Sequence, residues 1–131
     1  MAAGPSSTVA NAILNAYFNQ TNITAPTAIW IQLHIGDPGA SGTANVATNT
    51  TRKDITAVIA AASGGAVTSD TLVSWTSVPA SEDYTHWAMF SASSAGTFYW
   101  SGTITANPVT TGDTFNLAVG DIDVSLTPVA A

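Results

Sequence analysis

The sequence predicts an all-β protein: an antiparallel two-sheet β-sandwich of seven or eight strands, with jelly-roll winding as one option, and a short N-terminal helix. Three observations predict it. Short runs of alternating apolar and polar residues recur after residue 27, turn residues interrupt them about every ten residues, and only one segment has helical spacing. One helix cannot cover both faces of a parallel sheet. The 131 residues fit one domain, 1–131, with an arm at 1–7, a helix at 8–19 and the sandwich at 27–128.

The helix is predicted from apolar residues that recur three and four positions apart. Ser7 or Thr8 is the expected N-cap, because a hydroxyl oxygen accepts a hydrogen bond from the free N–H groups of the first turn. The segment from Asn19 to Pro26 ends the helix, since its residue types favour turns. The apolar positions are Val9, Ile13, Leu14, Ala16, Tyr17 and Phe18. This apolar side must be covered by the sandwich or by a neighbour.

The first strand is expected at 28–35, where every second residue is a large aliphatic. Trp30, Gln32 and His34 take the opposite face in this pattern. A long loop follows at 36–51, opened by the turn residues of Gly36-Asp37-Pro38-Gly39. Connections of this length are uncommon, so we expect the loop to be functional or to lie on a partner.

Further strands are expected at 52–60, within 66–76, at 84–90, 97–105, 115–119 and 122–126. The runs at 84–90 and 97–105 are joined by a glycine-bearing turn and form a hairpin. The inward-facing positions of all these strands give the expected core: Ile29, Ile31, Leu33, Ile35, Ile55, Ile59, Phe98, Trp100, Phe115, Leu117, Val119, Ile122, Val124 and Leu126.

Charge excludes several classes of function. Arg52 and Lys53 are the only basic residues, against eight acidic ones, and the net charge is −6. Binding to nucleic acid or to anionic lipid needs several basic contacts, so neither is an expected partner. We also expect no membrane segment, since no apolar run approaches about 20 residues, and no secretory signal. A surface so poor in charge suits a protein that packs against copies of itself or a large assembly. The alternative is a soluble domain that its hydroxyl side chains and its net charge keep in solution.

Catalytic chemistry is not indicated. His34 precedes Asp37 by three residues, and His86 follows Glu82 and Asp83, but no Gly-x-Ser-x-Gly elbow supplies a nucleophile. Two histidines in separate strands are too few for zinc, and the chain has no cysteine. We therefore expect a protein that is not an enzyme and binds no cofactor.

Two binding alternatives remain open. Asp113, Asp121 and Asp123 could hold calcium, although aspartates beside glycines more commonly cap turns. Trp30, Trp87 and Tyr99 could form a stacking platform for a sugar, but core or oligomer contacts account for such aromatics more often.

Several segments carry a family resemblance: Trp30–Ala47, Thr51–Lys53, Ala61–Gly65, Tyr84–Trp87, Ala92–Phe98 with Trp100–Gly102, and Thr111–Phe115. From about Ala10 to Leu126, the chain resembles small virion structural proteins of bacteriophages that infect actinobacteria, labelled head-decoration, minor tail or tail-fibre proteins. The Leu-His-x-Gly-Asp-Pro-Gly run is the most specific segment. The resemblance implies a β-sandwich with an N-terminal helical segment that works as a homo-oligomer on the particle, without enzyme activity.

We therefore expect a capsid decoration protein that binds the outer surface of the assembled shell and stabilises it. The alternative is a minor tail or tail-fibre-associated protein with a receptor- or glycan-binding role. The expected partners are the major capsid protein and copies of the chain itself, with a trimer favoured over a dimer. The expected location is the capsid surface of a virion assembled in the host cytoplasm. The candidate interface comprises Val9, Ile13, Leu14, Tyr17, Phe18, Trp30, Trp87 and Tyr99.

Overall fold

The computed structural model describes residues 3–129, except for the side chains of residues 106 and 107; residues 1–2 of the expected arm lie outside it. It contains one helix and nine strands within that range. The elements in chain order are β1 (Gly4–Pro5), α1 (Ser7–Phe18), β2 (Trp30–His34), β3 (Lys53–Asp54), β4 (Ala66–Thr68), β5 (Val73–Trp75), β6 (Glu82–Phe90), β7 (Phe98–Val109), β8 (Phe115–Leu117) and β9 (Asp123–Ser125). The prediction of an all-β fold with a short N-terminal helix is confirmed.

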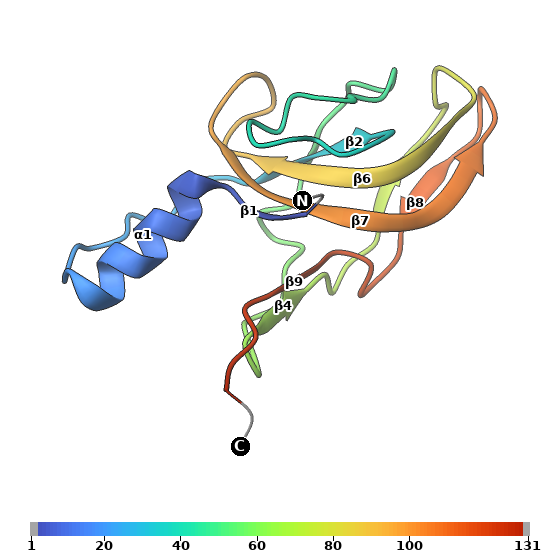
Figure 1. The fold of residues 1–131 in the computed structure, drawn as a ribbon. Coiled ribbons are helices and arrows are strands. Elements are labelled where there is room, and N and C mark those ends of the chain that lie inside the picture. The colour runs from blue at the N-terminus through green and yellow to red at the C-terminus, as the bar shows by residue number, and fades with distance from the viewer. Residues whose placement is uncertain (1–2, 130–131) are drawn as a thin grey trace.

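The strands form one large sheet and two strand pairs, all antiparallel. The large sheet has the order β1-β7-β6-β2-β3, and β4 pairs with β9 while β5 pairs with β8. The long strands β6 and β7 curve across the middle of the molecule, and the β4–β9 pair extends towards the C-terminus (Figure 1). The strand count exceeds the expected seven or eight because of β1, which has only two residues and is too short for an alternating pattern. The strand expected at 52–60 is shorter than predicted and consists of the two residues of β3.

The core lies between the large sheet and the β5–β8 pair. Phe115 of β8 makes an edge-on contact with Tyr84 of β6 at 4.8 Å between ring centroids, and a tilted one with Trp75 of β5 at 5.9 Å. Across the large sheet, Leu33 pairs with Trp87, which pairs in turn with Gly102. Six of the expected core residues are fully buried: Ile31, Leu33, Ile55, Phe115, Leu117 and Ile122.

Three expected core residues are instead exposed: Ile35 by 46%, Val119 by 63% and Leu126 by 51%. Each lies just beyond the end of a strand, where the period of two no longer fixes which way a side chain faces. Val119 lies in a tight turn closed by the hydrogen bond from Asp121 N to Ala118 O. The rest of the expected set, Ile29, Ile59, Phe98, Trp100 and Val124, is partly buried.

The second face of β2 is buried as well, because the 36–51 loop folds back over it. The loop pairs with the strand through Ile35 N to Asn45 O and Ala47 N to Leu33 O, at 2.9 and 3.2 Å. The ring Nδ1 of His34, which is fully buried, lies 2.8 Å from the carbonyl oxygen of Ala44. The loop therefore covers part of its own sheet, and the expectation that it is functional or lies on a partner stays a prediction.

Arg52 joins the end of this loop to the turn between β6 and β7. Its Nε donates to Gln32 Oε1 at 2.8 Å, and its Nη1 donates to the carbonyl oxygens of Ala92 and Ala95, each at 2.7 Å. The guanidinium carbon lies 3.7 Å from the centroid of the Phe90 ring. One of the two basic residues of the chain is therefore engaged in internal contacts.

Candidate interaction surface

Helix α1 begins and ends at defined caps. Ser6 is the N-cap: its hydroxyl oxygen accepts from Val9 N at 3.2 Å, so the cap lies one residue before the expected Ser7 or Thr8. The amide of Ser6 donates to Tyr99 O at 2.8 Å, which fastens the start of the helix to β7. At the other end, Asn19 N and Thr21 N both donate to Asn15 O. The helix is fixed at its base and directed away from the sheet.

The helix projects from one side of the β-sheet body (Figure 1). None of the twelve residues Ser7–Phe18 is buried, although most of them are apolar. Leu14 is 54% exposed, Tyr17 77% and Phe18 81%. Burial of aromatic and aliphatic side chains is the main driving force for helix packing. These three side chains of the helix are therefore left without the apolar contacts that normally cover them.

An apolar groove of about 430 Å³ separates α1 from the body. Thr8, Val9, Ala12 and Ile13 line it from the helix. The opposite wall comes from the connection after the helix and from strands of the large sheet and the β4–β9 pair; it consists of Ile23, Thr24, Pro26, Ile29, Ile59, Val67, Met89, Tyr99, Trp100 and Val124. Among the described residues that line the groove, none carries a formal charge. The site is therefore suited to apolar side chains.

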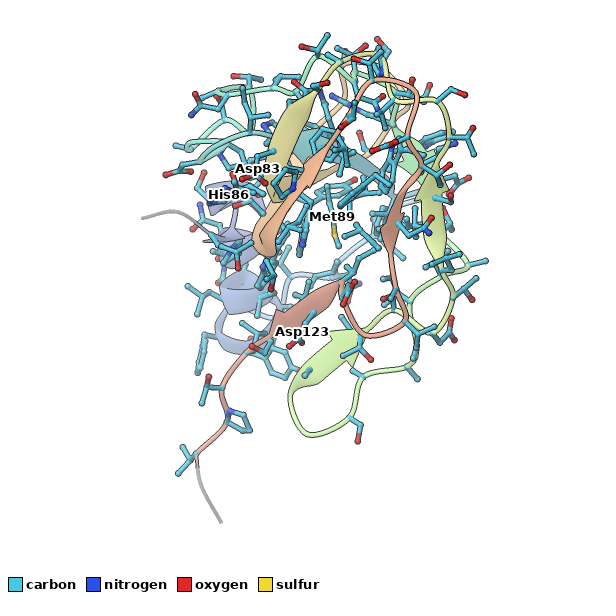
Figure 2. All side chains as sticks on the ribbon, turned by 90° about the vertical axis from the view of Figure 1, so that its right-hand side faces the viewer. Asp83, His86, Met89 and Asp123 are labelled. Atoms are coloured by element: carbon cyan, nitrogen blue, oxygen red, sulfur yellow. The ribbon has the colours of Figure 1, made fainter. Side chains whose placement is uncertain are left out.

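A β-bulge gives the groove two adjacent aromatic residues. Met89 pairs with Trp100 but Phe90 pairs with Phe98, so the register shifts and Tyr99 has no direct partner on β6. A bulge of this kind turns a side chain that strict alternation would place on the other face. Tyr99 and Trp100 can thus both line the groove. Met89 lies in the interior, between β6 and the β4–β9 pair (Figure 2).

The structure separates the eight residues of the candidate interface. Val9, Ile13 and Tyr99 meet in the groove, and Leu14, Tyr17 and Phe18 lie exposed on the helix. Trp30 is half-buried on β2 and does not line the groove.

The structure contradicts the expected position of Trp87 in the interface. It is 1% exposed, packs in the core and is not on the surface. The physical reason is a second register shift, between Tyr84 and His86, which places both Tyr84 and Trp87 on the core side of β6. With Trp87 in the core and Tyr99 in the groove, the aromatics considered for sugar stacking form no common exposed platform among the described residues.

Several groove residues were missed as surface features. Ile29, Ile59, Trp100 and Val124 were expected in the sandwich core, and Val67 and Met89 were not singled out. The alternation of apolar and polar residues along a strand shows only which side chains face apolar surroundings. Residues that line an apolar groove and residues in a core therefore give the same sequence pattern. The apolar helix was the one available indication that a complementary apolar wall exists.

Among the described residues, the titratable groups do not gather into a metal site. Within residues 3–129, no three His, Asp or Glu side chains come together in a way that could hold a metal ion. Asp113 and Asp121 accept hydrogen bonds from Thr110 N and Ala118 N in their own turns, which is the turn-capping role weighed against calcium. Figure 2 shows Asp83 and His86 together on β6, and Asp123 on β9.

His34 and His86 are direct cross-strand partners on β2 and β6. Burial is the main cause that lowers the pKa of His34, and the nearby His86 and Arg52 lower it further, against the opposing effect of the hydrogen bond to Ala44. The neutral imidazole is therefore the stable form at this position.

Among the described residues, no helix is long and apolar enough to cross a membrane.

A protein-family model matches residues 4–125, which include the helix, the groove and all nine strands. The match defines the chain as a bacteriophage structural protein, a component of the virion. Its family is described as podophage GP4 fiber I protein gp80, and the chain belongs to that family. No curated protein matches the chain. The expectation of a phage structural protein is confirmed at this level; head decoration and an actinobacterial host stay predictions.

Proposed function

We propose that the protein is a non-enzymatic component of a phage tail fibre. The observation that carries the proposal is the family match over residues 4–125 to a fibre protein. This is the tail-fibre alternative of the sequence analysis, and the family description favours it over capsid decoration. The chain acts by being part of the particle, through surfaces that pack rather than through a site that reacts.

The structure supports a packing role in two ways. Leu14, Tyr17 and Phe18 are exposed on α1, the helix that forms one wall of the apolar groove and projects from one side of the molecule (Figure 1). Two charged side chains hold loops of the chain in place: Arg52 donates to carbonyl oxygens of the turn after β6, and Glu82 accepts from backbone amides of the 36–51 loop. An exposed apolar surface of this kind is typical of protein–protein interaction sites.

Capsid decoration is the second candidate, and one observation favours it. The described residues form a short, compact β body with a twelve-residue helix, and they include no long helical stalk. In that case the partner is the major capsid protein, and many copies cover the shell. The two candidates therefore differ in stoichiometry.

Copy number per particle distinguishes the candidates. Quantitative mass spectrometry of purified virions, calibrated with labelled peptides of this chain and of the major capsid protein, gives their ratio directly. A fibre component is expected at a small multiple of the copy number of tail proteins, far below that of the capsid protein. A ratio close to that of the shell subunits would contradict the fibre assignment and support decoration.

A further inference from the structure

Helix α1 is apolar on two sides; its own chain covers the groove side only in part and leaves the far side exposed. Val9, Ala12 and Ile13 face the groove, while Leu14 and Phe18, one turn apart, lie on the far side. Thr8 also lines the groove, and the other polar side chains of the helix are those of Ser7, Asn11 and Asn15. A helix that is apolar around most of its circumference is normally enclosed by other structure. The groove side and the far side both need an occupant.

We propose that the ridge formed by Leu14, Tyr17 and Phe18 of one copy inserts into the groove beneath α1 of a neighbouring copy. The ridge and the groove then satisfy each other, and each chain supplies both. The proposal goes beyond the fibre assignment and does not depend on where in the virion the protein lies.

Charge favours a second copy as the occupant. The sequence has no Asp, Glu, Lys or Arg before Asp37, so the whole helical segment is uncharged. No described residue that lines the groove is charged either. A partner with a basic or acidic docking segment would find no counter-charge at this site. Two copies with a net charge of −6 each repel one another least when they meet through this uncharged side.

The sizes of ridge and groove agree. A cavity of about 150 Å³ can hold a benzene molecule, so the groove, at about 430 Å³, has room for the three ridge side chains. Aromatic side chains bury about 150–250 Å² each, so covering the exposed parts of Tyr17 and Phe18 removes roughly 300 Å² from water. Leu14, Ile23 and the groove walls add to this area on the way to the roughly 800 Å² per partner of a standard interface.

The contact is compatible with two kinds of symmetry. The ridge and the groove are different patches of one chain, so two copies can exchange them across a two-fold axis, or each copy can have one neighbour on either side in a head-to-tail arrangement. Head-to-tail contacts close into a ring when the rotation between neighbours is a simple fraction of a turn. A cyclic trimer is the smallest ring of this kind, and it is the oligomer favoured from the sequence.

The test uses the full chain and two variants that disable opposite halves of the contact. Phe18→Glu places a charge on the ridge, and Asn15→Glu is its matched control at a polar position of the same helix. Ala12→Trp fills the groove with the chain's own side chain and leaves the ridge intact. Masses are measured by light scattering after size exclusion, and circular dichroism verifies that each variant is folded. Phe18→Ser is the milder ridge variant if Phe18→Glu fails to fold.

The wild type and Asn15→Glu are expected as oligomers, while Phe18→Glu and Ala12→Trp each fall to the monomer mass of 13.3 kDa. Mixing the two monomeric variants is the decisive step. The intact ridge of Ala12→Trp should enter the intact groove of Phe18→Glu, which yields a one-to-one heterodimer that cannot grow further.

Three results would overturn the proposal. A wild type that stays monomeric at its highest soluble concentration excludes self-association; if Phe18→Glu then also fails to join virions, the ridge binds a different virion protein. An Ala12→Trp variant that keeps the wild-type mass shows that the groove is not the binding site. A mixture that remains monomeric means that the contact is not ridge into groove.

Discussion

Gly102 leaves the space that the indole ring of Trp87 occupies. A Cβ atom added at Gly102 would lie 2.1 Å from Cζ2 and 2.4 Å from Cε2 of Trp87, whereas ordinary contacts begin at about 3.4 Å. The indole cannot move aside easily, because it is fully enclosed in the core. Gly102 does not have a positive φ, so steric overlap alone determines the effect. We expect Gly102→Ala to lower the free energy of unfolding by about 2–3 kcal/mol, at the upper end of overpacking effects.

Thermal and urea denaturation followed by tryptophan fluorescence measure this effect. For a domain of this length, 1 kcal/mol corresponds to roughly 3–5 °C, so the melting temperature should fall by roughly 6–15 °C. Trp87→Phe provides the control, because the smaller ring leaves room for the new methyl group. In that background Gly102→Ala should cost much less, and the difference is the coupling energy. An unchanged melting temperature in the single variant, or an equal loss in both backgrounds, would refute the steric argument.

Three further predictions concern the core, the loop and the pH response. Leu117→Ala should cost about 2–5 kcal/mol, since Leu117 is fully buried; a denaturant midpoint equal to that of the wild type would show that its face of β8 is not core. Arg52→Lys should cost about 1–2 kcal/mol and speed proteolysis between Ala92 and Ala95, because one ammonium group cannot reach both carbonyls and Gln32 at once; unchanged cleavage would contradict that role. The lowered pKa of His34 means that the unfolded chain binds its proton more tightly, so stability is complete above about pH 6.5 and decreases as the pH falls below it. Urea midpoints measured from about pH 7.5 to 5.5 should show this decrease, and His34→Gln should flatten it in that range; an equal slope in both proteins would exclude His34 as the cause.

Where strands are regular, the sequence was enough to predict the fold. The alternation in β2 assigns Ile31 and Leu33 to the core correctly, because a strand paired on both sides keeps its period of two. The same pattern was wrong at Ile35, where the strand has already ended. It also missed that the opposite face of β2 is buried, since cover by a loop leaves no periodic signal.

The candidate site could be predicted only in part. The apolar helix was correctly placed, because three- and four-residue spacing is a local property of the chain. The side on which Trp87 and Tyr99 lie was not predictable, because it depends on two β-bulges set by pairing between distant segments. The groove itself arises from the distance that α1 keeps from the sheet, which no local pattern encodes.

A cryo-electron microscopy reconstruction of the complete virion tests the central claim most directly. We predict density for the β body in fibres attached to the tail, with α1 enclosed between neighbouring copies and Phe18 in contact with the next chain's Trp100. Density for this fold on the capsid shell, or fibre density in which α1 stays exposed to solvent, would contradict the account.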